Sequence, residues 1–290
     1  MQFGRLATAL YTPFTKSLDI DWNSLERTIE HLIQTGTDTI VVSGTTAESP
    51  TLSLEEKLKL FQFVVKQAQD RVQVIAGTGS NDTAQTIEVT KLAAETGVDG
   101  IMLVTPYYNK PSQAALYQHF KSIATHTTLP IMIYNVPGRT AVNMTATTMV
   151  QIAQIENVVA IKEASGDIEQ ITQLIKELPS SVVVYSGDDA VTLPILSLGG
   201  VGVVSVASHL VGSEIKEMID AFITGDVNKA KTINQKLFPV FTGLFMTSSP
   251  VPLKYAMSEQ GFCEPYVRPP LVEMSESEKK SATEWLGTLV

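Results

Sequence analysis

Cysteine is almost missing from this chain of 290 residues, in which Cys263 is the single example. One cysteine cannot form an intrachain disulfide, and it excludes the cysteine clusters that hold structural metals. Four histidines are present, without the spacing of metal ligands: His31, His119, His126 and His209. We therefore expect no metal site.

Long apolar runs and clusters of positive charge are also missing. No run is long enough to span a bilayer, and the first residues lack the basic and then apolar pattern of a secretion signal. With 21 basic and 30 acidic side chains the net charge is −9, which disfavours nucleic acid and anionic membranes as partners. We expect a cytoplasmic protein, whose acidic balance still allows an anionic substrate to be held by a local arginine.

The chain is rich in short apolar runs, which alternate with amphipathic segments. Eight such runs are Leu6–Leu10, Thr39–Val42, Val72–Ala76, Gly100–Val104, Pro130–Tyr134, Val158–Lys162, Val182–Tyr185 and Val201–Val206. Helical periodicity lies between them, for example at 22–34, 54–69, 83–95, 113–125, 145–155 and 168–178. Eight βα units with nearly continuous apolar strands predict an α/β fold, a (β/α)8 TIM barrel.

The strand signal stops after Gly225, and helical patterns continue to the end. They are interrupted by prolines at 250, 252, 269 and 270, and Ser275–Glu278 has the pattern of a helix start. We predict a catalytic barrel over residues 1–225 and a C-terminal α-helical domain over residues 226–290.

Lys162 stands at the end of the apolar run 158–162 and is the most informative side chain of the sequence. Strand alternation predicts that Val158, Ala160 and Lys162 share one face, with Val159 and Ile161 on the other. A buried lysine has a lowered pKa, and a neutral amine is a nucleophile towards carbonyl groups. The alternative from this strand alone is a lysine that reaches solvent at a strand end.

Polar residues follow most of the runs, where a barrel would place its chemistry. They form five motifs, Gly44-Thr45-Thr46-Ala47-Glu48-Ser49, Pro106-Tyr107-Tyr108, Tyr134-Asn135-Val136-Pro137-Gly138-Arg139-Thr140, Lys162-Glu163-Ala164-Ser165-Gly166 and Ser186-Gly187-Asp188-Asp189. Gly77-Thr78-Gly79 lacks the third glycine of a dinucleotide fingerprint, so Asn81 or Asp82 is expected to cap the next helix.

These five motifs, taken in order over the whole chain, resemble the dihydrodipicolinate synthase family. One departure is Ala47, where many members have glycine. The resemblance implies a barrel aldolase that condenses pyruvate with L-aspartate-4-semialdehyde through a Schiff base. It implies no cofactor, because the imine itself accepts electrons.

The same resemblance implies a role for individual residues. Lys162 would form the imine, Tyr134 would move protons, and Thr45 would link Tyr134 to Tyr108 of an adjacent subunit. A carboxylate of pyruvate would bind at Thr45 and Thr46, and the aldehyde substrate at Arg139. Gly187 and Val204 would line the pocket. The implied assembly is a homo-oligomer, a dimer usually paired into a tetramer.

Two rival functions stay open at this point. An N-acetylneuraminate lyase or a keto-deoxy-sugar aldolase would share the barrel, the lysine and the tyrosine, but generally lacks the Asn135–Thr140 motif. A catalytically silent binding barrel would be expected to have lost Lys162 or Tyr134.

Feedback control by lysine is expected to be weak. Lysine-sensitive relatives tend to have histidine at the positions of Leu54 and Lys57, and glutamate at Gln85. The amide of Gln85 cannot pair with an ammonium group as a carboxylate does.

Overall fold

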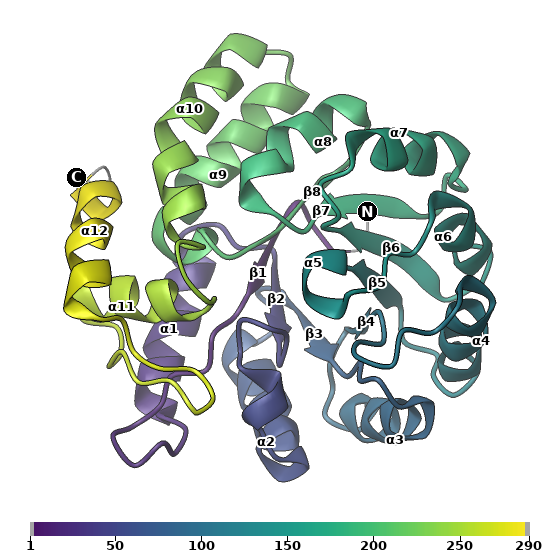
Figure 1. Ribbon diagram of the computed structural model, residues 1–290, viewed down its shortest axis with the longest axis horizontal. Helices are drawn as coiled ribbons and strands as arrows, with labels where there is room; N and C mark the ends of the chain where they lie inside the picture. Colours follow the sequence, from purple (N-terminus) through teal and green to yellow (C-terminus); the bar gives the residue numbers. More distant parts are fainter. Residues whose placement is uncertain (1–2, 288–290) are drawn as a thin grey trace.

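The computed structural model describes residues 3–287, and its strands close into a barrel (Figure 1). Each strand pairs in parallel with the next one along the chain, and β8 pairs with β1. The strands are β1 (Leu6–Ala9), β2 (Thr39–Val42), β3 (Gln73–Gly77), β4 (Gly100–Val104), β5 (Ile131–Asn135), β6 (Val158–Glu163), β7 (Val183–Ser186) and β8 (Gly202–Ser205). This closure confirms the predicted (β/α)8 architecture.

Helices cover the outside of the barrel. Those between the strands are α1 (Trp22–Gln34), α2 (Leu54–Ala68), α3 (Thr83–Ala94), α4 (Gln113–Ala124), α5 (Pro137–Thr140), α6 (Ala146–Ile152), α7 (Ile168–Glu177) and α8 (Thr192–Leu198). Two turns of 3-10 helix are η1 (Ser49–Thr51) and η2 (Asp189–Val191). The sequence pattern did not separate α5 or α8 from the loops, and the four residues of α5 are too few for a helical period.

Short polar side chains determine where many of these helices begin. An N-cap side chain accepts a hydrogen bond from the first turn at Asp21, Ser53, Asp82, Ser112, Thr145, Asp167, Asp226 and Ser275. Each such bond satisfies an amide that has no partner inside the helix, and contributes about 1 kcal/mol. The expected cap at Asp82 and the expected helix start at Ser275 are both confirmed.

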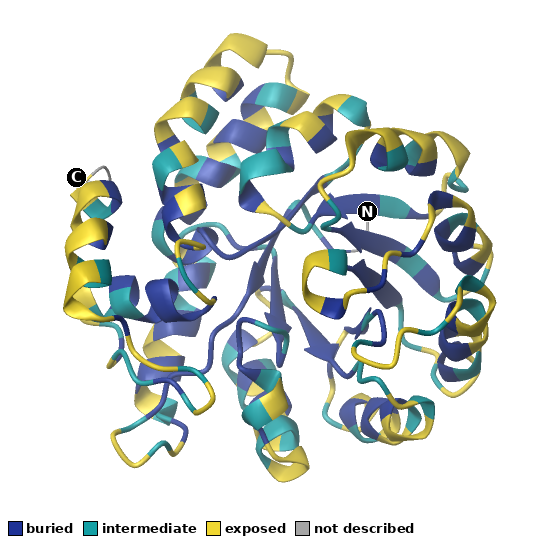
Figure 2. Cartoon of the chain, viewed as in Figure 1, coloured by how far each residue is buried: buried dark blue, intermediate teal, exposed yellow. Residues whose placement is uncertain are grey.

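The barrel wall separates two apolar regions, and the strands are buried on both sides (Figure 2). The outer region, between strands and helices, contains Ile40, Val74, Ile133 and Ile161. The inner region fills the barrel with side chains that include Ala7, Val41, Met132, Tyr134 and Tyr185. The interior is therefore a packed core, and its chemistry is confined to the ends of the strands.

The first part of β6 departs from simple alternation. The register of β5 and β6 shifts by one residue, so that Ile131 pairs with Val158 and Met132 with Ala160. Val158 consequently packs in the outer region with Ile161, while Val159 packs against the inner core. The prediction that Val158 shares a face with Lys162 is therefore wrong, because a β-bulge places one extra residue in the strand.

The chain continues after β8 with α9 (Ser208–Ile223), α10 (Val227–Gly243), α11 (Val251–Glu259) and α12 (Glu276–Leu286). Figure 1 shows α10, α11 and α12 gathered on one side of the barrel, near α1 and α9. An apolar cluster joins α9 to this side through Ile215 and Ile219, with Phe241 and Met257. The two-domain division at residue 225 stays a prediction. None of the helices in residues 3–287 is long and apolar enough to cross a membrane.

Candidate active site

Lys162 lies near the end of β6 and points into the barrel. Its register partners are Tyr134 on β5 and Tyr185 on β7, both members of the inner core. The residue is only 5% exposed. Within residues 3–287 its amine has no hydrogen bond and no ion pair, and it lies 4.1 Å from the centre of the Tyr134 ring. The structure thus brings together the predicted nucleophile and the predicted proton donor.

Burial has a direct electrostatic effect on this amine. Loss of solvent disfavours the ammonium form and lowers the pKa of Lys162 to about 7. The negative charge of Asp189 opposes this shift, and the positive charge of Arg139 adds to it. At neutral pH roughly half of the molecules would carry a free amine, whereas an exposed lysine is almost fully protonated.

The phenol of Tyr134 is also buried, but burial raises the pKa of an acidic group instead of lowering it. Burial raises the pKa of its phenol to about 12, and the positive charge of Arg139 offsets this only in part. Desolvation is the larger of the two effects. The phenol has no hydrogen-bond partner within residues 3–287. It is therefore a neutral O–H group that can donate and accept at the same oxygen.

The loop after β2, residues 43–48, is folded by its own backbone. Ala47 N–H donates to the carbonyl oxygen of Gly44, and Glu48 N–H donates to that of Thr45. In the part of the chain that the structure describes, the amides and hydroxyls of Thr45 and Thr46 have no partner. They are free donors at the rim where the strands end, which is a suitable arrangement for a carboxylate.

Arg139 lies in α5, directly after β5 (Figure 1). The side chain is exposed, and its charge is still close enough to influence the pKa values of Lys162 and Tyr134. The segment that follows Arg139 is anchored by the side chain of Asn135. This side chain forms hydrogen bonds with Glu163, Asn143 and the amide of Met144. A guanidinium group on such an anchored turn can bind a carboxylate with two parallel hydrogen bonds.

Gly187 and Val204 lie beside the lysine end of the barrel. A Cβ atom added to Gly187 would be 2.7 Å from Cβ of Ala164 and 3.2 Å from Cε of Lys162. Glycine at this position therefore leaves room for the lysine side chain. Val204 is buried in the inner core on β8. The sequence predicted both as lining residues without a physical reason for the glycine.

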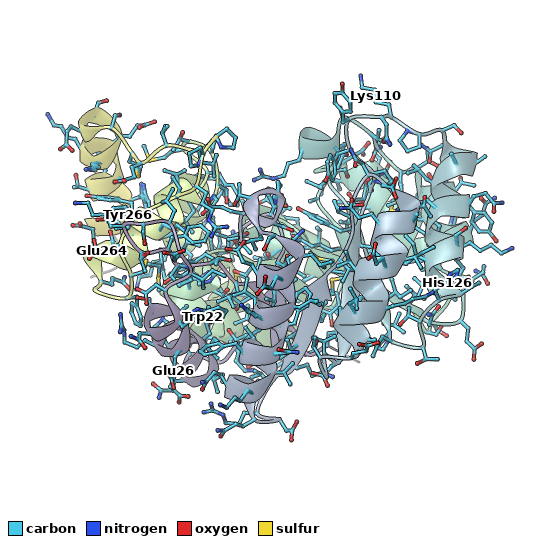
Figure 3. All side chains as sticks on the ribbon, turned by 90° about the horizontal axis from the view of Figure 1, so that it is seen from below. Trp22, Glu26, Lys110, His126, Glu264 and Tyr266 are labelled. Atoms are coloured by element: carbon cyan, nitrogen blue, oxygen red, sulfur yellow. The ribbon has the colours of Figure 1, made fainter. Side chains whose placement is uncertain are left out.

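Tyr108 is not brought to the other predicted site residues within this chain. It is 88% exposed, with a left-handed backbone (φ of 74°). No hydrogen bond within residues 3–287 links it to Thr45 or Tyr134. Figure 3 shows Lys110, two residues further along the same loop, at the outer edge of the molecule. A role of Tyr108 in this site consequently requires a second subunit.

Two buried carboxylates near Lys162 were quoted in the sequence motifs without a role. Asp189 accepts hydrogen bonds from the hydroxyl of Ser205 and from the amides of Val206 and Ala207. Glu163 accepts them from Asn135 and from the amide of Ser165. Burial raises the pKa of each carboxyl group. The signal in the sequence was an acidic residue at the end of β6, for Glu163, and one shortly after β7, for Asp189.

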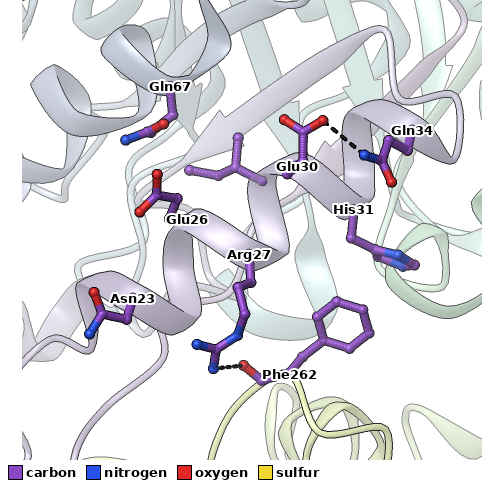
Figure 4. A pocket seen from close by; sticks show the side chains of 9 residues that line it. Asn23, Glu26, Arg27, Glu30, His31, Gln34, Gln67 and Phe262 are labelled. Carbon is purple, nitrogen blue, oxygen red and sulfur yellow. Dashed lines mark hydrogen bonds between the residues drawn. The ribbon is translucent and has the colours of Figure 1, made fainter.

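A concavity of about 660 Å³ lies elsewhere, on the outside of the barrel (Figure 4). It follows α1 from Asn23 to Gln34 and is bounded by Gln67 and Phe262. None of the predicted site residues lines it. Its polar groups are partly engaged, since Arg27 donates to the carbonyl oxygen of Phe262 and Gln34 to Glu30.

A parallel barrel with a buried, unpaired lysine at the C-terminal ends of its strands has the architecture of an imine-forming, class I aldolase. A family model, that of the dihydrodipicolinate synthetase family, matches residues 2–288. The chain belongs to this family.

Individual relatives agree with this assignment over their full length. The chain is 52% identical to 4-hydroxy-tetrahydrodipicolinate synthase of Bacillus subtilis (strain 168), with 100% of both chains covered. The structure of dihydrodipicolinate synthase from Bacillus anthracis matches with a TM-score of 0.97 at 48% identity, covering 99% of this chain and 98% of that one. The enzyme from Cyanidioschyzon merolae, solved with lysine bound, matches with a TM-score of 0.95 at 43% identity, covering 99% of both.

Replacing Lys162 by methionine should stabilise the protein. The native amine has a pKa of about 7, against about 10.4 when exposed. Below pH 7 the Lys162 amine is charged in both the native and the unfolded state, so the full free-energy cost of burying the charge opposes folding. Between pH 7 and 10 this cost falls with rising pH, because the native state has already released its proton. Lys162→Met should therefore raise the unfolding free energy by about 1–3 kcal/mol at pH 6, and by less at pH 9. Calorimetry at both pH values measures this difference.

Lys91→Met is a matched control, because Lys91 is an exposed lysine on α3. It should leave stability unchanged at both pH values. A Lys162→Met protein that is less stable than the parent at pH 6 would show that the amine has a stabilising partner.

Proposed function

We propose that the chain catalyses the condensation of pyruvate with L-aspartate-4-semialdehyde to 4-hydroxy-tetrahydrodipicolinate, in the biosynthesis of diaminopimelate and lysine. The observation that carries the proposal is the buried Lys162 amine, which packs on the ring of Tyr134 and has no counter-ion within residues 3–287. Family membership supplies the substrates, since the B. subtilis relative is a 4-hydroxy-tetrahydrodipicolinate synthase.

Imine formation is the first step. The neutral Nζ atom of Lys162 attacks the C2 carbonyl of pyruvate, and the resulting carbinolamine loses its hydroxyl group as water. That hydroxyl needs a proton to leave, and we assign its donation to the phenol of Tyr134, whose ring lies against the Lys162 amine. Because the pKa of Tyr134 is raised, the phenol acts as a shuttle that regains a proton as it donates one.

Pyruvate is held by its carboxylate. The unpartnered amides and hydroxyls of Thr45 and Thr46 offer donors at the rim, and Gly187 and Val204 border the lysine. Donors aimed at one end of the substrate orient its carbonyl towards the amine, which raises the rate by proximity.

Carbon–carbon bond formation follows from the imine. The protonated imine accepts the electrons left when C3 of pyruvate loses a proton, so an enamine forms without a metal or an organic cofactor. The enamine carbon attacks the aldehyde of the semialdehyde, and the semialdehyde's amino group then attacks C2 and displaces Lys162. Arg139, exposed on α5, is placed to bind the carboxylate of this second substrate.

The working unit is a homo-oligomer, with a dimer of dimers as the expected form. Tyr108 supports this inference, because it is fully outside the site of its own chain and its large ring is exposed. In a dimer Tyr108 of one subunit would complete the proton path through Thr45 and Tyr134 of the other. A cytoplasmic location fits a biosynthetic role and stays a prediction.

Borohydride reduction in the presence of pyruvate tests the proposal. One reduced pyruvate adduct per chain should form, and peptide mapping should place it on Lys162. The rate of adduct formation should rise with pH around a midpoint near 7, because the neutral amine is the reactive form. An adduct on another lysine, or activity without any adduct, would contradict the assignment.

Arg139→Ala should separate the two substrates. Loss of a charged hydrogen-bond partner costs about 1.5–3 kcal/mol, which is roughly 10- to 100-fold in the KM for the semialdehyde. The yield of pyruvate adduct should change little, since Arg139 lies on the exposed turn. Steady-state kinetics with each substrate varied in turn gives the comparison. Equal effects on both KM values would argue against this division, and Lys110→Ala, another exposed cation near the rim, is the control.

Mixed subunits test the contribution of Tyr108. Tyr108→Phe protomers and Lys162→Ala protomers should each be inactive alone, and mixing them should restore part of the activity. A mixed dimer contains one site with an intact Lys162 and an intact Tyr108 from its partner. Mass spectrometry must show that the subunits exchange. If they do and activity stays absent, Tyr108 acts within its own chain.

L-lysine should inhibit weakly or not at all. Leu54 is exposed at the start of α2, Gln85 is exposed on α3, and burial lowers the pKa of Lys57. Losing one charge-assisted bond to the ligand costs roughly one to two decades of affinity. Titration of lysine into the assay decides the question, and half-inhibition below about 1 mM would contradict the prediction. Gln85→Glu should increase sensitivity if this position determines it.

A further inference from the structure

A buried ion pair joins the 43–48 loop to the C-terminal helices. Lys254 of α11 donates to one carboxylate oxygen of Glu48, and the amide of Arg268 donates to the other at 2.8 Å. The side chains of Glu48 and Lys254 are 1% and 0% exposed. Lys254 also donates to the carbonyl oxygen of Tyr266, which Figure 3 labels on the C-terminal side of the molecule.

The pair is surrounded by further contacts that hold it in place. The Lys254 amine lies 4.0 Å from the centre of the Phe14 ring, and the Arg268 guanidinium lies 4.4 Å from it. Arg268 also forms two hydrogen bonds to Glu56 and donates to the carbonyl oxygens of Leu18 and Thr51. Arg268 is thereby attached to the chain just after the 43–48 loop and to the connection between β1 and α1.

Glu48 also contacts the part of the loop that carries the free donors of Thr45 and Thr46. Its amide donates to the carbonyl oxygen of Thr45, at 3.0 Å, so the two residues move together. Glu48 also has a left-handed backbone, with φ of 56°, which is unfavourable for a residue other than glycine. The carboxylate contacts therefore hold the loop in a conformation that its backbone alone would disfavour.

Stability alone gives no reason for an ion pair here. Two buried charges lose their hydration, and apolar residues of the same size are often at least as stabilising. An ion pair differs from apolar packing in its geometry, because each carboxylate oxygen is directed to one donor.

We propose that Glu48 and Lys254 are positioning residues for pyruvate, which fix the Thr45–Thr46 donors from the C-terminal helices. This inference rests on the proposed function. The C-terminal helices then determine the affinity of the barrel for its first substrate through the 43–48 loop.

The experiment compares Glu48→Gln, Lys254→Met and the double variant with the parent enzyme. Each single variant should raise the KM for pyruvate about tenfold or more, because a small displacement of the donors misaligns the carbonyl, while kcat and the KM for the semialdehyde change less. The double variant has no unpaired buried charge, so its melting temperature should return towards that of the parent. Its pyruvate KM should stay raised, because the directed contact is still missing.

Asp38→Asn is the matched control. Like Glu48, Asp38 binds a lysine, Lys216, and backbone amides, which belong to Arg5 and Leu6. These contacts lie at the start of β1, at the opposite end of the barrel. Asp38→Asn should lower the melting temperature and leave the pyruvate KM unchanged.

Two outcomes would overturn the inference. The first is a pyruvate KM of the single variants that equals that of the parent below their melting temperatures. The second is a pyruvate KM of the double variant that recovers together with its melting temperature. Failure of the proposed function is a separate result, since the parent enzyme would then form no pyruvate adduct with borohydride.

Discussion

Desolvation of the Lys162 amine is the constraint on which the site depends. The closed barrel removes water from the end of β6, and the lysine lies there between two tyrosines, with no counter-ion in the part of the chain that the structure describes. A carboxylate in direct contact would keep the amine charged and unreactive. The structure instead places the nearest acidic groups where backbone amides and hydroxyls hold them. The low pKa of the amine is therefore a property of the whole strand arrangement.

Buried carboxylates have one recurring task around this centre. Asp189 binds the amides that follow β8, Glu163 binds the amide of Ser165, and Glu48 binds the amide of Arg268. Asp189 and Glu163 thereby fix segments that begin where a strand ends, and Glu48 joins the loop after β2 to the chain that follows α11. Negative charge at the rim thus positions the backbone, and the groups that we propose to face the substrates are amines, phenols, amides and a guanidinium. This division is suited to substrates that carry carboxylates.

Sequence patterns predicted the barrel because eight apolar runs are a strong and repeated signal. They also singled out Lys162, since an amine at the end of such a run is conspicuous, whereas the role of Tyr134 was implied by the family resemblance. The register shift in β6 could not be predicted, because alternation in Val158–Val159–Ala160 looks the same with or without a bulge. The pairing of Glu48 with Lys254 was equally inaccessible, because 206 residues separate them and neither position has a local pattern.

The long separation of Glu48 and Lys254 has a consequence for the order of events during synthesis. A growing chain emerges from the ribosome with its N-terminal part first. All eight strands, with Lys162 and Tyr134, are complete before Lys254 and Arg268 have been added. A nascent barrel could therefore bury its reactive amine while the loop that carries Thr45 is still unanchored. Competence for pyruvate would be the last property that the translated chain acquires, after its last helices have docked.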